Sequence, residues 1–216
     1  MKPLPIQKRA LLKRTALLNA ARQDFSEYGF EITTAKSIAG RAGVAIGTFY
    51  QYFDDKNDIL RVLASNRMEL LSENVELYKI SVIVDSGGVV EEGGLNNGFE
   101  IEARFRQALS FIYQFHCQDP ELHQVLEERR NNDPLLKTIL VNGEEILLQR
   151  VLRFVQCFNL SKPEIVAANL FAMAEGLVHR HVFGDDQSDV NDVVGIGAQM
   201  LAAYFYRCAD FNRAKV

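Results

Sequence analysis

The sequence predicts an all-α protein with a small three-helix N-terminal domain, residues 1–55, and a larger helical C-terminal domain, residues 56–216. Three observations support this prediction. Apolar residues recur at helical spacing along almost the whole chain, and no segment alternates apolar and polar residues as a strand does. Asp-Pro pairs and glycines interrupt the pattern as helix starts and stops do. Residues 33–56 contain two short helical patterns separated by Gly43.

The first predicted helix carries an apolar stripe and ends at Gly29, a natural C-cap. The stripe consists of Leu17, Leu18, Ala21, Phe25 and Tyr28. We expect this helix to pack behind the two short helices and to complete a three-helix domain.

Residues 33–56 predict a helix-turn-helix. Thr33 or Thr34 can cap the first short helix, because a threonine oxygen accepts a hydrogen bond from an amide of the first turn. Gly43 provides the backbone geometry of a tight turn. The second helix spans about residues 46–53 and is expected to bury Phe49, Tyr52 and Phe53. Its expected outward residues are Ile46, Gly47, Thr48, Tyr50 and Gln51. Such a helix is shaped to lie in the major groove of DNA.

The rest of the chain predicts a series of longer helices. One helix is expected from Asp54 to about Val84. Residues 85–98 are expected to form a loop, because they include five glycines and two asparagines. Residues 99–118 resume the helical pattern. Asp119-Pro120 and Asp133-Pro134 each predict an N-cap followed by proline at the first helical position.

The last two helices are marked by similar signals. Ser161 is expected to open one of them, with Pro163 in its first turn. The polar segment at residues 184–189 separates it from a final helix that reaches about Cys208.

Composition indicates an ordinary globular chain. Its 216 residues are 48% hydrophobic and 24% charged, which is enough to bury a sizeable core. No run of about 18 apolar residues occurs, so no membrane span is expected, and the N-terminus lacks the apolar core of a signal peptide. The three cysteines, Cys117, Cys157 and Cys208, form no zinc spacing and suit a reducing cytoplasm. We therefore expect a cytoplasmic protein without a cofactor.

Charge is divided unevenly along the chain. Residues 1–53 hold eight Lys or Arg and three acids, a net charge of +5, which leaves −9 for the remainder of a chain whose total is −4. This asymmetry favours contact of the N-terminal part alone with a polyanion. Basic N-terminal tails are also common without such a function.

Residues 16–60 resemble the DNA-binding domain of TetR-family transcriptional regulators. In chain order they show an apolar pair with Ala-Ala, a Phe shortly before a Gly, then Thr-Thr, Ile-Ala, Ala-Gly-Val, Gly-Thr and Phe-Tyr-Gln-Tyr-Phe, and a Lys that opens the next helix. Ala45 departs from the Ser or Thr that often caps the second short helix, and Asp24 departs from an apolar residue. The resemblance implies a homodimeric, ligand-responsive repressor that binds a palindromic operator in double-stranded DNA.

Phosphate contacts are expected to supply affinity, and base contacts specificity. Tyr50 and Tyr52 carry hydroxyls that can donate to phosphate, as the resemblance implies, although Tyr52 is also a candidate core residue. Lys56 and the amides at the start of its helix can hold the same anion. The flanking backbone can be held by Thr33, Thr34 and Lys36, with simple capping as an equal alternative for the threonines.

Base readout is expected from the start and outer face of the second short helix. The candidates are Ala45, Ile46, Gly47, Thr48 and Gln51. Ala45 and Ile46 can touch thymine methyls and Gln51 can pair with adenine, but this helix offers no arginine for guanine. Specificity is therefore expected to depend on methyl contacts and DNA shape.

A small-molecule effector is expected to bind the C-terminal domain, among helices that the resemblance associates with a pocket. The candidate lining is Phe105, Phe111, Ile112, Phe115, Phe154, Phe158, Phe171 and Met173. Core packing is an equal alternative for each of them. Glu175 interrupts an apolar run, and a buried carboxylate needs a partner, either a cationic effector group or a protein group. The aromatic lining favours an apolar or amphipathic effector.

The final two helices carry stripes rich in small residues, which the resemblance places at a homodimer seam. One stripe is Ala168, Ala172, Gly176 and His179, and the other is Gly197, Leu201, Tyr204 and Cys208. Packing within one chain is the alternative.

The sequence contains no recognisable catalytic or metal site. His179 and His181 lack the i, i+4 spacing of helical metal ligands, and His116-Cys117 suits ordinary packing. The remaining alternatives to a ligand-gated repressor are an activator of the same fold and a ligand-independent DNA-binding regulator.

Overall fold

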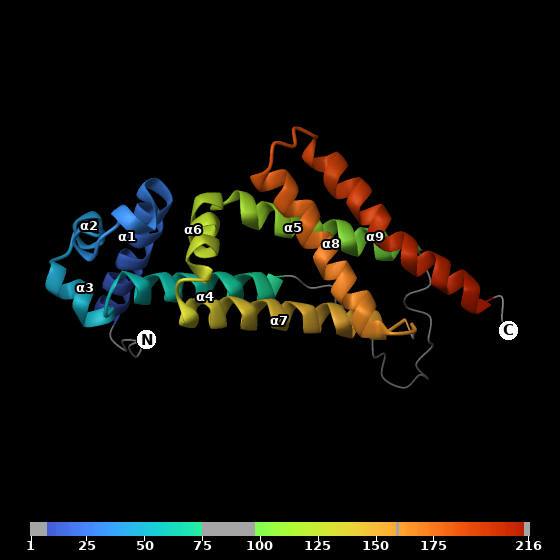
Figure 1. The fold of residues 1–216 in the computed structure, drawn as a ribbon, viewed down its shortest axis with the longest axis horizontal. Helices are drawn as coiled ribbons and strands as arrows, with labels where there is room; N and C mark the ends of the chain where they lie inside the picture. Colours follow the sequence, from blue (N-terminus) through green and yellow to red (C-terminus); the bar gives the residue numbers. More distant parts are fainter. Residues whose placement is uncertain (1–7, 75–97, 159, 214–216) are drawn as a thin grey trace. The chain divides into compact units, whose positions relative to one another are not determined.

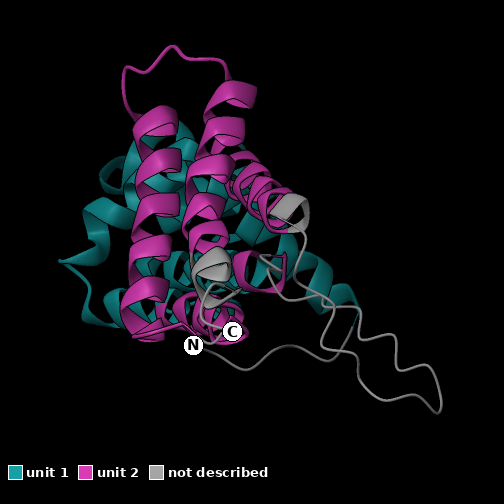
Figure 2. Ribbon diagram, turned by 90° about the vertical axis from the view of Figure 1, so that its right-hand side faces the viewer, with its two compact units in different colours: residues 1–70, 118–144 teal, residues 71–117, 145–216 magenta. Residues whose placement is uncertain are grey.

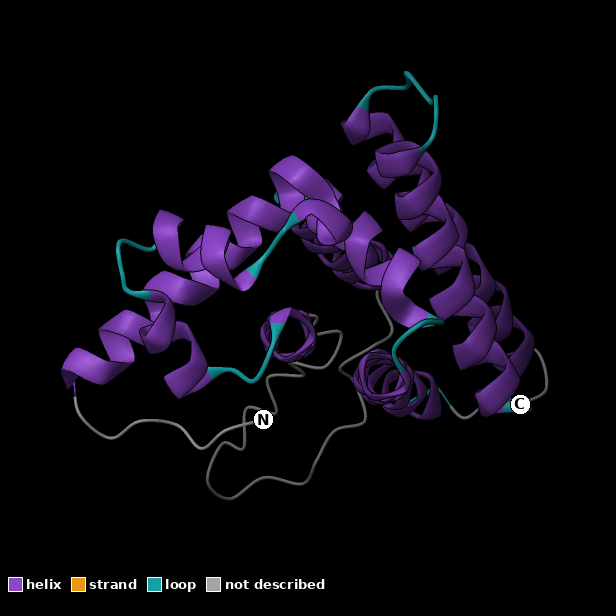
Figure 3. Ribbon diagram, turned by 60° about the vertical axis from the view of Figure 1, so that its left-hand side comes forward, coloured by secondary structure: helices purple, strands orange, loops and turns teal. Residues whose placement is uncertain are grey.

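The computed structural model describes residues 8–74, 98–158 and 160–213, and every regular element in these ranges is a helix (Figures 1 and 3). The helices are α1 (Lys8–Ile32), α2 (Ala35–Arg41), α3 (Ile46–Tyr52), α4 (Lys56–Asn74), α5 (Gly98–Cys117), α6 (Pro120–Arg130), α7 (Pro134–Gln156), α8 (Pro163–Phe183) and α9 (Val190–Arg213). The predicted all-α fold is confirmed. The predicted extension of the fourth helix beyond Asn74, and the predicted loop apart from Gly98, lie outside the described residues. None of the helices in the described ranges could cross a membrane, since each is too short or too polar.

The chain forms two compact units (Figure 2). Unit 1 comprises residues 1–70 and 118–144, and unit 2 comprises residues 71–117 and 145–216. Unit 1 therefore includes α6 and the first part of α7, whereas the sequence suggested a boundary between residues 55 and 56. That boundary stays a prediction about where separate functional domains meet.

The core of unit 1 is built on the apolar stripe of α1. Leu17, Ala21 and Phe25 are fully buried. The helical run bends at Gly29, whose φ of 73° belongs to the left-handed region that favours glycine. Tyr28 was predicted to share the buried stripe, but it is half exposed. Its ring lies 5.7 Å from the Arg41 guanidinium, so it covers that cation rather than the core.

The two predicted Asp-Pro helix starts are correct in position, but only one aspartate acts as a side-chain cap. Asp133 Oδ1 accepts from the amides of Leu135 and Leu136 at 3.0 and 3.1 Å, and its Oδ2 accepts from Arg61 Nε at 2.8 Å. Burial raises the pKa of Asp133, but these hydrogen bonds outweigh it and lower the pKa overall. Asp119 instead accepts from Ser26 Oγ at 2.9 Å, which ties the start of α6 to α1.

Helices α4 and α7 cross closely in unit 1 at Gly143. A Cβ atom added at Gly143 would lie 2.7 and 2.8 Å from Cγ and Cβ of Met68. These distances are shorter than real Cβ contacts, so the crossing requires a residue without a side chain at this point.

Unit 2 packs α5 against α8 and α9 around an aromatic cluster. The rings of Phe105, Phe154 and Phe205 lie 5.6–5.8 Å apart in pairs, and all three are buried. Helix α8 begins at Pro163, one residue after Lys162, which adopts a left-handed conformation with φ of 56°.

Candidate nucleic-acid interface

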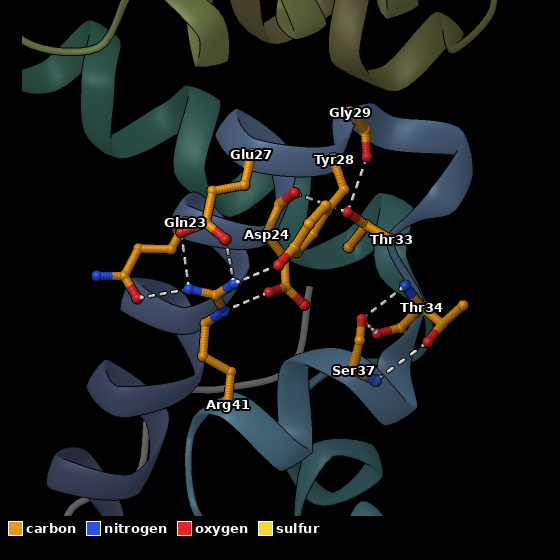
Figure 4. Close-up of polar contacts among 9 residues, drawn as sticks. All are labelled: Gln23, Asp24, Glu27, Tyr28, Gly29, Thr33, Thr34, Ser37 and Arg41. Atoms are coloured by element: carbon orange, nitrogen blue, oxygen red, sulfur yellow. Dashed lines mark hydrogen bonds and ion pairs between the residues drawn. The ribbon is translucent and has the colours of Figure 1, made fainter.

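Helix α2 begins with a reciprocal cap, visible in Figure 4. The amide of Ser37 donates to Thr34 Oγ1 and the amide of Thr34 donates to Ser37 Oγ, both at 3.0 Å. Thr34 is therefore the N-cap. Thr33 is 1% exposed, and its hydroxyl lies 2.7 Å from the carbonyl oxygen of Gly29 and 3.1 Å from that of Asp24. The expectation that Thr33 reaches DNA is not supported, because its side chain faces the domain interior.

The turn between α2 and α3 has the predicted glycine geometry. Gly43 has a φ of 66°, and the amides of Gly43 and Val44 donate to the carbonyls of Gly40 and Ala39 at 3.1 and 3.0 Å. Helix α3 follows with Ala45 at its N-cap, where no side chain satisfies an amide. The two helices and their turn form the helix-turn-helix that the sequence predicted.

Helix α3 is anchored within unit 1 by two aromatic side chains, one on its inner face and one at its C-cap. Phe49 and Phe53 are buried, and their rings lie 5.7 Å apart. The guanidinium of Arg14 lies 5.5 Å from the centre of the Phe53 ring. Sequence reasoning counted Arg14 only as charge, and no spacing signal connects it with Phe53.

The outer face of α3 carries most of the predicted base-contacting residues. Ile46 is 42% exposed and Tyr50 is 52% exposed. The other predicted residues at or near this face divide into exposed Ala45, Gly47 and Gln51 and half-buried Thr48 and Tyr52. On the neighbouring helix, Lys36 is exposed. Ten of the eleven predicted DNA-contacting residues therefore have accessible side chains or backbone, and Thr33 is the exception.

Lys56 connects the start of α4 to the end of α1. Its Nζ donates to the carbonyls of Phe30 at 2.7 Å and Glu31 at 3.2 Å, and it lies 4.2 Å from the centre of the Phe30 ring. An ammonium has three donors, so one more contact is available for an anion. A change at Lys56 would consequently disturb helix packing as well as any phosphate contact.

A second arginine fixes α2 against α1 (Figure 4). Arg41 Nε lies 2.5 Å from Oδ1 of Asp24, which is 1% exposed, and Arg41 Nη1 donates to Glu27 Oε1 at 2.9 Å. The hydrogen bond to Glu27 raises the pKa of Arg41, and the same bond lowers the pKa of Glu27. This pair was not predicted from the sequence. Its signal was Asp24, which stands where the family pattern has an apolar residue, because a carboxylate buried at such a position needs a cation.

Unit 2 has a hollow of about 600 Å³ along α5. It is lined by Glu102, Ala103, Arg106, Gln107, Ser110, Phe111 and Gln114. Arg106 Nη2 donates to Glu102 Oε1 at 3.0 Å within this lining. Five of the seven lining residues carry polar groups, but apolar atoms form most of the lining surface, and Phe111 is its one member from the predicted aromatic lining.

The other predicted effector residues lie elsewhere in unit 2. Phe105, Phe115 and Phe154 are buried, whereas Ile112, Phe158 and Phe171 are partly buried against the core. Met173 and Glu175 are exposed on α8. The expectation that Glu175 is a buried carboxylate was wrong, because its side chain is exposed in the single chain.

Helices α8 and α9 expose apolar and small side chains. On α8 these are Ile165, Ala168, Ala172, Met173 and Gly176, and on α9 they are Ile196, Met200, Ala203 and Tyr204. The predicted α8 stripe is therefore accessible. On α9, Gly197 and Leu201 are buried within the single chain, which agrees with the alternative of intramolecular packing at these two positions. A Cβ at Gly197 would meet Leu177 and Leu109 of the same unit at 3.1 and 3.3 Å.

Sequence comparison identifies the N-terminal segment. Residues 17–63 match the family described as bacterial regulatory proteins, tetR family. The regulator HbdR of Aromatoleum sp. strain CIB is 38% identical over 63 residues, 29% of this chain and 28% of that protein. The fatty acid metabolism regulator protein of Bacillus subtilis is 39% identical over 64 residues, 30% of this chain and 33% of that protein. The chain thus matches about a third or less of the length of these curated relatives.

Solved structures extend the likeness of the fold to most of the chain. The fatty acid degradation regulator FadR of Bacillus halodurans has a TM-score of 0.65 at 19% identity, with 94% of this chain and 97% of that chain covered. The complex of SmeT, a Stenotrophomonas maltophilia repressor, with triclosan also has a TM-score of 0.65 at 19% identity, with coverages of 89% and 90%. At these identities the likeness supports the fold alone.

Proposed function

The chain belongs to the TetR family of bacterial regulatory proteins through its N-terminal helix-turn-helix, and we propose that it is a cytoplasmic, homodimeric repressor released from a palindromic operator by an amphipathic effector. The observation that carries this proposal is the outer face of α3, which presents small, polar and aromatic groups from a helix fixed by Phe49 and Phe53. The proposal assigns the chain no catalytic activity.

In this proposal the exposed groups divide into two sets. Thr34, Lys36, Tyr50, Tyr52 and Lys56 contact phosphates, which supply affinity and register. Base edges are read by Ala45, Ile46, Gly47, Thr48 and Gln51. Thr33 is left out because it is buried.

The DNA test compares matched lysines. Binding to the DNA upstream of the protein's own gene should weaken as salt rises, and Lys36→Ala should weaken it for all sequences and reduce the salt slope by about 1. Lys137→Ala, which alters an exposed lysine of α7, is the control and should have little effect. Gln51→Ala should instead change the base preference. If Lys36→Ala combined with Tyr50→Phe left the operator affinity unaltered, the assigned face would be wrong.

The accessible apolar side chains of α8 and α9 support a homodimer. A dimer is also expected from the proposed function, because helix-turn-helix proteins read palindromes as dimers. A Cβ at Gly176 would meet nothing within 4 Å in the single chain, so a monomer can accommodate Gly176→Leu. A closely packed seam cannot, because the added side chain overpacks it. Sedimentation should show a dimer for the unaltered protein and a folded monomer for Gly176→Leu. Gly40→Leu, at an equally open helical glycine of unit 1, should stay dimeric.

We place the effector in the hollow along α5. Arg106 can bind a carboxylate if that group displaces Glu102, and Phe111 offers apolar contact at the same hollow. Two of the similar proteins are named regulators of fatty acid metabolism or degradation, so a long-chain fatty acid is the first probe. It should weaken operator binding, and by linkage operator DNA should weaken fatty acid binding by the same factor.

Arg106→Gln should remove most of the response to the fatty acid, whereas Arg150→Gln on α7 should keep it. Fatty acid binding that left operator affinity unchanged would contradict release by this ligand. The ligand-independent regulator of the same fold would then be the better description.

A further inference from the structure

Two histidines of unit 2 meet between α5 and α8. His116 Nε2 and His179 Nε2 lie 3.1 Å apart, and the ring centres are 4.9 Å apart. His116 is buried and His179 is half-buried. The ring of Phe183 packs against both, with centres at 6.1 and 5.4 Å, so an apolar wall borders the pair.

Hydrogen bonding fixes the orientation of His116. Its Nδ1 lies 2.8 Å from the carbonyl oxygen of Ile112, and a carbonyl can only accept. Nδ1 must therefore carry the proton, which leaves the lone pair of the neutral ring on Nε2, facing His179. A backbone carbonyl that holds one imidazole nitrogen is the arrangement that orients metal-bound histidines.

We propose that His116 and His179 are two ligands of a divalent transition-metal ion in unit 2. Zinc–nitrogen bonds of about 2.0–2.1 Å at a tetrahedral angle place two ligand nitrogens ~3.3 Å apart. The observed 3.1 Å needs only a small adjustment to reach this value. Imidazole nitrogens favour zinc, copper, nickel or cobalt over magnesium or calcium, and water or other donors complete the coordination.

The remaining described histidine of α8 has a different environment. His181 Nδ1 is hydrogen-bonded to the Tyr113 hydroxyl, and its Nε2 lies 2.8 Å from the carbonyl oxygen of Ser188. Both of its ring nitrogens are thus committed to groups of the protein. His181 is a matched control, two residues from His179 on the same helix.

The test is a titration of the full-length, metal-free protein with Co²⁺, followed by its visible absorption, and then with Zn²⁺ in competition. The unaltered chain should bind one ion, and bound metal should raise the midpoint of thermal unfolding because it binds only the folded state. His179→Ala should weaken Co²⁺ binding by about 100-fold or more. Loss of a residue that only orients a metal ligand typically weakens binding by ~10–100-fold, and loss of a ligand itself should weaken it at least as much. His181→Ala should bind as the unaltered protein does.

His116→Ala is a second variant, with helical circular dichroism measured to confirm folding. Because His116 is buried, the half-buried His179 provides the decisive variant if His116→Ala does not fold. Absence of Co²⁺ binding to the unaltered protein would mean that the pair is an N–H···N hydrogen bond alone. Undiminished binding by His179→Ala would also overturn the proposal, as would an equal loss in His181→Ala.

Discussion

Unit 1 and unit 2 both bury aromatic rings, but the outer face of α3 in unit 1 differs from the exposed faces of α8 and α9 in unit 2. Helix α3, the proposed recognition helix of unit 1, exposes Gly47, Tyr50 and Gln51, groups that can contact a hydrated polyanion. Unit 2 exposes large apolar side chains, with Ile196 and Met200 at 58% and 57%. The difference indicates that the outer face of α3 can remain wet in its complex, whereas the exposed faces of α8 and α9 gain most from a dry contact.

The units also differ in how their helices are fixed. In unit 1, directional polar contacts join helices: Arg41 with Asp24, Arg61 with Asp133, and Ser26 with Asp119. In unit 2, the helices are joined mainly by contacts between aromatic rings, such as that between Phe105 and Phe154. Directional contacts set the position of a helix closely, as a DNA-reading surface requires. Substitutions can test this contrast.

The largest expected effect separates core aromatics of unit 2 from the aromatic at its hollow. Phe154→Ala should lower the free energy of unfolding by about 3–5 kcal/mol, because Phe154 is buried among Phe105, Phe158 and Phe205. Phe111→Ala should cost clearly less, because Phe111 is half-buried and lines the hollow. Urea unfolding measures both. Equal costs would mean that Phe111 belongs to the core and that the two sites are not distinct.

The next effect compares two helical glycines of unit 1. Gly143→Ala should destabilise the protein by about 1–3 kcal/mol, since the new Cβ would overlap Met68 where α4 and α7 cross. Gly40→Ala meets nothing within 4 Å and should stabilise it by up to about 1 kcal/mol through helix propensity. If the crossing is as close as described, thermal unfolding should show a lower midpoint for Gly143→Ala and a higher midpoint for Gly40→Ala. A stabilising Gly143→Ala would show that α4 and α7 can separate readily.

A smaller effect concerns the polar contacts of unit 1. Asp133→Asn keeps a good N-cap residue but loses the charged partner of Arg61, and should cost about 1–2 kcal/mol at neutral pH. The folded pKa of Asp133 is lowered, so its contribution is full above the unfolded pKa of about 3.9 and is lost as the pH falls through the folded pKa. The difference in the free energy of unfolding between Asp133→Asn and the unaltered protein should therefore shrink as the pH becomes acidic. Glu128→Gln, at an exposed acid, should show little difference at any pH.

Features set by neighbouring residues were predictable from the sequence. The Gly43 turn, the cap at Thr34 and the Asp133-Pro134 helix start all depend on groups within a few residues of one another. Features that depend on which helices meet were not predictable. Periodicity indicates that Phe105 and Leu201 lie on apolar faces, but it does not distinguish a core from a pocket or a seam. The contact between His116 and His179 likewise joins residues 63 positions apart.

The smallest effect tests whether the recognition helix is poorly capped. Ala45 is the N-cap of α3 in an extended conformation, with φ of −66° and ψ of 148°, and no side chain satisfies the first amides. Serine at this position can accept from one of them, so Ala45→Ser should raise the free energy of unfolding by about 0.5–1 kcal/mol. Thr34→Ala, which removes the existing cap of α2, should lower it by a similar amount and calibrates the measurement. DNA affinity separates two consequences of the same change. If Ala45 touches a thymine methyl, serine should alter preference at one base pair while the stability rises. A uniform change across sequences would show that position 45 acts through the helix start alone, and no gain in stability would mean that water already satisfies those amides.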